Sequence, residues 1–155
     1  MSNKIKICNN PYSGKDFPIF QNYPFELDDF QKYAIQAIEE KENVLVMAGT
    51  GSGKTLCAEY AIEKSIQLGK KVIYTSPIKS LSNQKFNEFN RKWPGDRVGI
   101  LTGDIKFNPD AQILNQSIAA SSEQKSPGSV IVASGVSNTS IEILSLPVHP
   151  ASVIS

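Results

Sequence analysis

A glycine-rich segment constrains this chain more than any other feature. It reads Ala48-Gly49-Thr50-Gly51-Ser52-Gly53-Lys54-Thr55 and follows a short apolar run at Asn43–Ala48. It matches the phosphate-binding loop, except that Ala48 replaces the first glycine. Glycines allow the backbone to point successive N–H groups at a polyphosphate, and the following helix presents its positive end to the same anion. The segment therefore predicts a buried strand, a phosphate-binding turn and a helix from about Lys54 to Leu68.

Two residues at the end of this loop have expected chemical roles. Lys54 is expected to reach the β- and γ-phosphates, and the Thr55 hydroxyl to hold Mg²⁺. The alternative is an ordinary strand-to-helix turn with a solvated lysine, but the strand before and the helix after the loop favour ATP or GTP binding. The predicted phosphate-binding residues are Ala48, Gly49, Thr50, Gly51, Ser52, Gly53, Lys54 and Thr55.

Expected helices and strands alternate along the chain. A helix capped by Asp28 runs to about Lys41, and another runs from about Lys79 to Trp93 with Leu81, Phe86, Phe89 and Trp93 facing inward. The strands expected after the loop are Lys71–Ser76, Arg97–Leu101 and one that begins at Ala111–Leu114. This alternation predicts an α/β fold with a parallel sheet, flanking helices and right-handed crossovers.

The composition changes sharply after residue 114. The 155 residues are enough for one domain, yet all 13 aromatic side chains lie before residue 115. The last 41 residues contain eleven serines and only three charged side chains, Glu123, Lys125 and Glu142. We therefore expect three segments: an extended lead-in at 1–24, a well-patterned domain at 25–114, and a Ser-rich, poorly ordered tail at 115–155.

Charge and cysteine content exclude several classes of protein. The net charge of +1 argues neither for nor against nucleic acid binding. Cys8 and Cys57 are the only cysteines, which excludes a disulfide framework or a zinc site built from cysteines. No run approaches the ~18 apolar residues of a membrane span. We expect a protein without a membrane partner in a reducing, intracellular compartment, cytoplasmic or nuclear.

Phe25 and Gln31 lie shortly before the phosphate loop and offer a way to read the nucleotide base. A glutamine amide can donate and accept at the adenine edge, while an aromatic ring can stack on the base. The alternative is that Phe25 and Phe30 are core residues and that Gln31 closes a capping box with Asp28. Spacing alone favours that alternative.

Taken together, these motifs resemble the first RecA-like domain of superfamily 2 RNA helicases, and in particular the Ski (superkiller)-type DExH-box group. Phe25–Gln31 is similar to the group's adenine-recognition motif, and Ala48–Thr55 to its motif I. Thr75–Lys85 is similar to motif Ia, and Gly99–Ala111 to the Thr-Gly-Asp motif. The resemblance implies an ATP-dependent helicase and NTP hydrolase that uses Mg²⁺. It also favours the adenine role for Phe25 and Gln31.

The same resemblance implies contacts with the backbone of single-stranded RNA. Hydroxyl groups, a lysine charge and an exposed backbone N–H suit phosphate contacts that carry no base sequence information. Without the resemblance, Pro77–Ser80 would be interpreted as a strand-to-helix loop with a helix cap. The implied RNA-binding residues are Pro77, Ile78, Lys79, Ser80, Thr102 and Gly103.

After Leu114 the chain departs from the family pattern. The family continues with an Asp-Glu-x-His motif, whereas no aspartate follows Asp110 and the only histidine, His149, has no acidic neighbour. The resemblance therefore implies a truncated, partial domain whose activity on its own is doubtful. Alternatives are a non-enzymatic nucleotide- or RNA-binding module and the product of a decayed gene.

The apolar run at Val130–Ala133 leaves two interpretations open. It faintly resembles the family's Ser-Ala-Thr segment and could form a strand beside the phosphate-loop strand. The alternative is a low-complexity sequence without a structural role.

Overall fold

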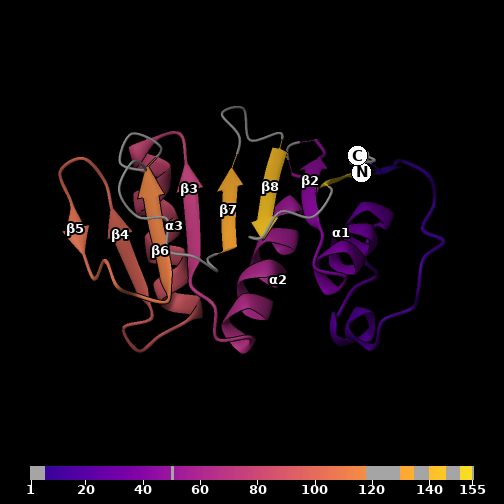
Figure 1. Cartoon of the computed structure of the whole chain (residues 1–155), viewed down its shortest axis with the longest axis horizontal. Helices are drawn as coiled ribbons and strands as arrows, with labels where there is room; N and C mark the ends of the chain where they lie inside the picture. The colour runs from indigo at the N-terminus through magenta and orange to yellow at the C-terminus, as the bar shows by residue number, and fades with distance from the viewer. Residues whose placement is uncertain (1–5, 50, 118–129, 135–139, 146–150, 155) are drawn as a thin grey trace, which may run out of the picture.

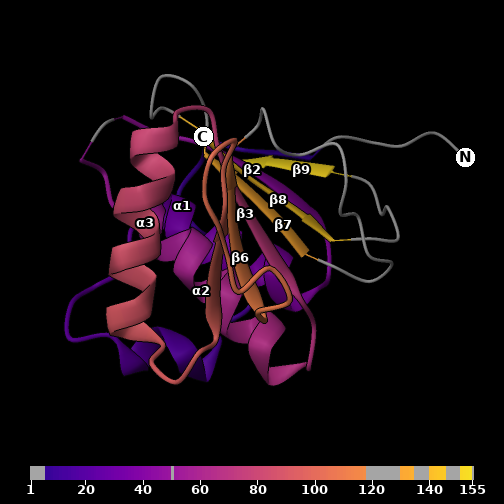
Figure 2. The ribbon, with the colours of Figure 1, turned by 90° about the vertical axis from the view of Figure 1, so that its left-hand side faces the viewer.

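The computed structural model describes residues 6–49, 51–117, 130–134, 140–145 and 151–154. It confirms the predicted α/β class: one nine-stranded sheet is covered on one face by three helices (Figures 1 and 2). The helices are α1 (Asp29–Glu39), α2 (Lys54–Gln67) and α3 (Lys79–Lys92), preceded by a short 3₁₀ helix, η1 (Pro18–Asn22). The strands are β1 (Lys6–Cys8), β2 (Asn43–Met47), β3 (Val72–Ser76), β4 (Val98–Leu101), β5 (Lys106–Phe107), β6 (Ile113–Ser117), β7 (Val130–Ser134), β8 (Ser140–Ser145) and β9 (Ala151–Ile154).

Strand direction brings the expected functional loops to one edge. The order across the sheet is β1-β9-β2-β8-β7-β3-β6-β4-β5. β3 is parallel to β6 and β7, and β6 is parallel to β4. β8 is antiparallel to both of its neighbours, so β2 and β7 point the same way. The carboxyl ends of β2, β3 and β4 therefore share one edge of the sheet, where ligands bind in open α/β folds.

The core lies between the sheet and the helices. Phe89 of α3 packs edge-on against Tyr74 of β3, with ring centroids 5.1 Å apart, and against Trp93, with centroids 5.2 Å apart. Of the four residues predicted to face inward from this helix, Phe89 of α3 and Trp93, which directly follows α3, are buried, while Leu81 and Phe86 are half-buried. Burial of such side chains stabilises the fold by roughly 1.5–3 kcal/mol each.

A three-residue contact fixes α1 against α2. Tyr60 of α2 donates a hydrogen bond to Glu39 Oε1 of α1 at 2.5 Å, and Lys64 Nζ lies 2.9 Å from Glu39 Oε2. Burial raises the pKa of Glu39, but the hydrogen bonds from Lys64 and Tyr60 outweigh burial and hold this pKa below its ordinary value. These contacts join the C-terminal end of α1 to the middle and the second half of α2.

Strands from the tail complete the sheet. β2 and β3 do not pair with each other, since β8 and β7 lie between them. The predicted strand at Val130–Ala133 is present as β7, but β8 separates it from β2 because the chain returns antiparallel after β7. β6 also extends three residues beyond Leu114. The connecting residues 118–129, 135–139 and 146–150 lie outside the described residues, and the three-segment division remains a prediction.

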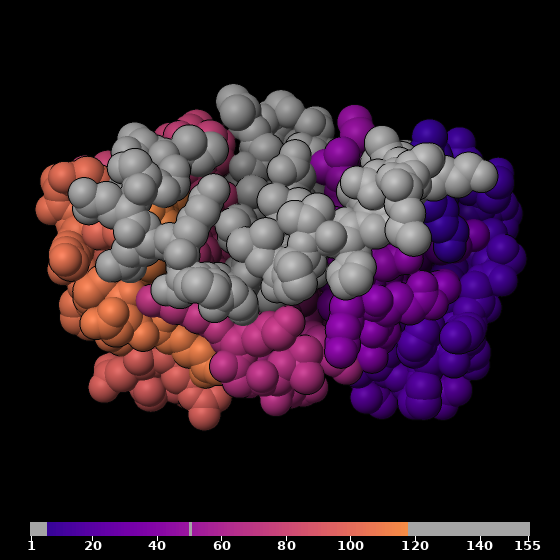
Figure 3. Space-filling view, viewed as in Figure 1, coloured from indigo at the N-terminus to yellow at the C-terminus, as the bar shows by residue number. Residues whose placement is uncertain are grey.

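The lead-in is more structured than a purely extended segment. β1 pairs with β9 at one end of the sheet, and η1 follows before α1. Tyr12 packs edge-on against Tyr33 of α1, with ring centroids 4.8 Å apart. In Figure 3 the N-terminal segment lies at one end of the molecule and the region of β4 and β5 at the other. Within the described ranges, every helix is too short or too polar to cross a bilayer.

Candidate functional site

The segment predicted to be a phosphate loop connects β2 to α2, as the sequence predicts. Gly51 and Gly53 have φ angles of +78° and +83°, in the left-handed region that side chains disfavour. Gly53 is the N-cap of α2, and a Cβ atom there would lie 2.8 Å from Gln31 Nε2. The backbone angle therefore favours glycine at this position, and a Cβ atom would also displace the Gln31 amide. Thr50 lies outside the described residues.

Lys54 begins α2 and folds back over the loop. Its side chain is almost fully buried, and Nζ donates to the carbonyl oxygens of Ala48 at 2.8 Å and Gly49 at 2.7 Å. The Ser52 hydroxyl is also buried, with no hydrogen-bond partner in the described part of the chain. The loop thus holds one cation and one unpaired polar group, both of which an oxyanion can satisfy.

Gln31 links α1 to this loop. Its Oε1 accepts a hydrogen bond from the backbone N–H of Asp28 at 2.9 Å, and its Nε2 donates to the carbonyl oxygen of Gly53 at 3.2 Å. Asp28 and Gln31 form a capping box, which confirms the part of the alternative interpretation that concerns Gln31. The structure adds the contact with Gly53, so Gln31 belongs to the helix cap and to the phosphate loop at the same time.

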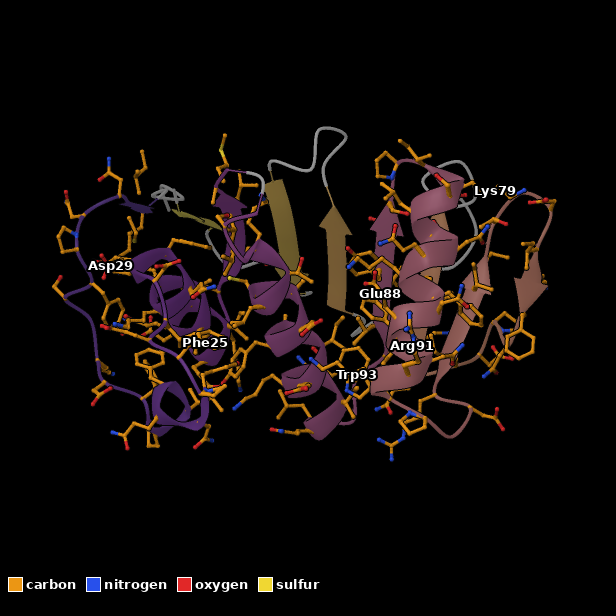
Figure 4. All side chains as sticks on the ribbon, turned by 180° about the vertical axis from the view of Figure 1, so that it is seen from behind. Phe25, Asp29, Lys79, Glu88, Arg91 and Trp93 are labelled. Carbon is orange, nitrogen blue, oxygen red and sulfur yellow. The ribbon has the colours of Figure 1, made fainter. Side chains whose placement is uncertain are left out.

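An open cavity of about 460 Å³ adjoins the loop. Phe25 lines it and is 52% exposed, with its ring 5.7 Å from that of Tyr23. Phe25 is therefore not a core residue, whereas Phe30 is partly buried and packs against the core. Figure 4 shows Phe25 on the segment before α1. The lining residues are Tyr23, Phe25, Gln31, Gly53, Thr55, Leu56, Glu59, Tyr60, Glu63 and Lys92.

A metal ion at this site would depend mainly on the nucleotide. Thr55 is exposed in the first turn of α2 and lines the cavity, so its hydroxyl can supply one oxygen ligand. Among the residues that the structure describes, no group of three histidine, cysteine or acidic side chains could hold a metal. Mg²⁺ commonly binds through few protein oxygens, with waters and substrate phosphates as its other ligands. The residues present therefore fit Mg²⁺ that enters with a triphosphate.

The second group of predicted residues lies at the same edge of the sheet, beyond β7 and β8. Ile78 is 50% exposed, Lys79, Ser80 and Gly103 are exposed, and Pro77 is half-buried. Thr102 differs from the expectation of an open hydroxyl donor, because it is 5% exposed and its hydroxyl is already bonded. Ser76 is likewise buried, with its Oγ 2.6 Å from Ser82 Oγ.

An ion pair connects the two loops of this second group. Lys79, the first residue of α3, contacts Asp104 Oδ2 in the turn after β4. Asp104 Oδ1 accepts a hydrogen bond from Thr102 Oγ1 at 3.1 Å, and Thr102 Oγ1 accepts one from the N–H of Ile105 at 3.2 Å. The hydrogen bond from Lys79 is the main cause that holds the pKa of Asp104 below its ordinary value. Sequence analysis named Lys79 and Thr102 but missed Asp104, whose position within the Thr-Gly-Asp motif was the available signal.

Comparison with known proteins places this chain in a family. The family described as DEAD/DEAH box helicase matches residues 28–132, which is more than half of the chain. The chain belongs to the DEAD/DEAH box helicase family. It is 53% identical over 97 residues to the ATP-dependent RNA helicase mtr4 of Schizosaccharomyces pombe, a match that covers 63% of this chain and 8% of that protein.

Two further relatives agree with this assignment. The chain is 49% identical over 94 residues to the antiviral helicase SKI2 of Saccharomyces cerevisiae, covering 61% of this chain and 7% of that protein. It is also 49% identical over 94 residues to the exosome RNA helicase MTR4 of Homo sapiens, covering 61% of this chain and 9% of that protein. The resemblance to Ski-type helicases inferred from the motifs is confirmed. The chain spans less than a tenth of the length of these relatives.

Proposed function

We propose that this chain is the ATP-binding portion of the first RecA-like domain of a Ski-type DExH-box RNA helicase. The observation that carries the proposal is the loop between β2 and α2, which presents Lys54 beside an open cavity lined by Phe25 and Gln31. The triphosphate would replace the carbonyl groups of Ala48 and Gly49 as the partner of Lys54. Thr55 would ligate Mg²⁺ as it enters with the nucleotide, and the ion would neutralise charge on the phosphates.

The cavity favours a purine nucleotide with its base next to α1. The exposed ring of Phe25 offers a stacking surface, and the amide of Gln31 has one unassigned N–H and one free lone pair beyond its two contacts. Those groups suit the donor and acceptor pattern of the adenine edge. The two buried free thiols, Cys8 and Cys57, fit the intracellular compartment expected for such a protein.

Single-stranded RNA is the second proposed ligand, bound along the same edge of the sheet. The exposed groups at Ile78, Lys79, Ser80 and Gly103 can contact a sugar–phosphate strand without reading its sequence. Phe25 and Lys79 lie toward opposite ends of the long axis of the molecule (Figure 4). ATP and RNA would therefore bind at separate parts of one edge, as coupling between the two ligands requires.

A binding module without hydrolytic activity is the second candidate function. One observation favours it: no aspartate follows Asp110, so no Asp-Glu pair follows any later strand of this chain. Under this alternative the chain would bind ATP and RNA without turnover.

Binding of a fluorescent ATP analogue to the purified chain tests the proposal. Lys54→Ala should abolish binding, because the phosphates lose their cationic partner. Lys70→Ala removes the same charge beyond the opposite end of α2, before β3, and should leave affinity unchanged. Equal affinity of the Lys54→Ala variant and the wild type would refute the nucleotide site. RNA-stimulated phosphate release by the purified chain would rule out the binding module, which binds without turnover.

A further inference from the structure

The two side chains proposed to hold RNA phosphate already hold an anion that belongs to the chain itself. Lys79 contacts one carboxylate oxygen of Asp104, and Thr102 donates its hydroxyl to the other oxygen. A carboxylate bound by one ammonium and one hydroxyl has the charge and the acceptor geometry of a phosphate with two of its oxygens engaged. The site is therefore a complete anion site with an internal occupant.

The surroundings show that this occupant can be exchanged. The side chains of Lys79 and Asp104 are 49% and 60% exposed, so both remain in contact with water. Thr102, in contrast, is 5% exposed and is fixed by two hydrogen bonds with Ile105. Its backbone N–H donates to the carbonyl oxygen of Ile105, and its hydroxyl oxygen accepts from the backbone N–H of Ile105. The hydroxyl of Thr102 thus stays in place while Lys79 and Asp104 are free to separate. An exposed ion pair contributes little to stability, which makes its replacement inexpensive.

We propose that Asp104 is an internal competitor for the RNA backbone: its carboxylate occupies the site where a phosphodiester of single-stranded RNA binds to Lys79 and Thr102. This inference rests on the proposed RNA-binding function and adds the residue that limits affinity. In the free protein Lys79 is neutralised by Asp104. When RNA binds, a phosphate takes Lys79, and the Asp104 carboxylate turns outward into solvent.

The competition also affects selectivity among polyanions. A ligand must supply enough contacts elsewhere along the edge to displace Asp104, so an isolated phosphate should bind poorly. An extended RNA strand that also contacts Ser80 and the backbone of Gly103 should displace Asp104 and bind. Lys106 is exposed on the neighbouring β5 and keeps the local charge positive once Asp104 has moved.

The test is fluorescence anisotropy with a fluorescein-labelled ten-nucleotide oligo(U) RNA at low salt, using the full chain. Asp104→Asn should tighten binding by about fivefold, the factor for removing one unit charge at contact distance from a phosphate in water. The dependence on salt should steepen by about 0.7 in log–log slope, as expected for one further effective phosphate contact on a single strand. Lys79→Ala should weaken binding, and Lys79→Ala combined with Asp104→Asn should lose the gain.

Asp96→Asn is the matched control. Asp96 is exposed and lies before β4, whereas Asp104 lies after it. The substitution therefore removes the same charge at the opposite end of this strand. Asp104→Ser, which retains an acceptor for Thr102, is a second variant expected to tighten binding, and circular dichroism verifies that each variant is folded. Wild-type binding with no gain in either Asp104 variant would overturn this inference alone. An equal gain in Asp96→Asn would also overturn it, and absence of RNA binding in every variant would overturn the proposed RNA function together with it.

Discussion

The amide of Gln31 donates a hydrogen bond to the carbonyl oxygen of Gly53 at 3.2 Å, across 22 residues of sequence. Gln31 is buried in the first turn of α1, and Gly53 immediately precedes Lys54. A side chain that caps one helix therefore also supports the loop that begins the next. Adenine recognition and phosphate binding would be mechanically linked through this one amide.

Gln31→Glu separates the two roles of that amide. The glutamate retains an oxygen to accept from Asp28, but it loses both N–H groups: the one that bonds Gly53 and the one proposed to face adenine. We expect the preference for ATP over GTP to fall by about tenfold, since one buried hydrogen bond is worth about 1 kcal/mol and an unpaired group costs more. Displacement of a bound fluorescent nucleotide by ATP and by GTP measures this preference. Full discrimination in both Gln31→Glu and Gln31→Ala would contradict the adenine role.

Glu39 should make the fold sensitive to acid. Its pKa is lower in the folded protein than its ordinary value near 4.5. Ionised Glu39 therefore stabilises the folded state at pH values above its ordinary pKa, and this stabilisation is lost as the pH falls through the lower pKa of the folded protein. Glu39→Gln should lower Tm at pH 6 and flatten the decline of Tm between pH 6 and pH 3. Glu26→Gln, which alters a carboxylate 91% exposed and 3.6 Å from Lys32, is the control and should leave the profile unchanged.

Asn115 is a polar residue buried in the middle of β6. It pairs with Tyr74 of β3 and Ile100 of β4 in the interior, is fully buried, and neither its amide nitrogen nor its oxygen has a partner among the described residues. Asn115→Val should stabilise the protein by about 1–2 kcal/mol by removing an unpaired amide. The corresponding rise in Tm is roughly 2–8 °C. Asn115→Asp, which buries a charge of similar shape, should destabilise; a lower Tm for the valine variant would refute this account.

Local signals were sufficient to predict the elements that position the site. The start of α2 at Lys54 and of α3 at Lys79 agree with the sequence, because glycines and Pro77 fix where each strand must end. The contact between Lys79 and Asp104 could not be predicted, since it joins residues 25 apart through the packing of α3 beside β4. The burial of Thr102 has a different, local cause: its hydroxyl accepts a hydrogen bond within the turn to which it belongs.

The position of the tail strands depends on long-range pairing, which composition does not reveal. Val130–Ser134 is parallel to β3 on one side and antiparallel to β8 on the other. Amides in a strand bonded on both sides exchange only when the sheet opens. Hydrogen exchange should therefore show protection across Val130–Ser134 comparable with that of Val72–Ser76. Exchange at the unfolded rate across Val130–Ser134 would show that β7 does not hold the sheet together.

The purified chain should neither hydrolyse ATP at a helicase-like rate nor unwind duplex RNA. Hydrolysis requires a carboxylate that helps to hold Mg²⁺ and to align water for in-line attack, besides the phosphate loop. Thr55 supplies one oxygen ligand, but the sequence after the loop contains no Asp-Glu pair. Removing one such electrostatic group typically costs about 10²–10³ in rate, and several are missing together.

Phosphate release from ATP, with and without RNA, measures this directly. Release should stay near background in the wild type and be the same in Lys54→Ala, because nucleotide binding alone does not align a water for attack. RNA-stimulated release on the order of 1 per second, lost in Lys54→Ala, would instead show that residues of this chain complete the hydrolytic site.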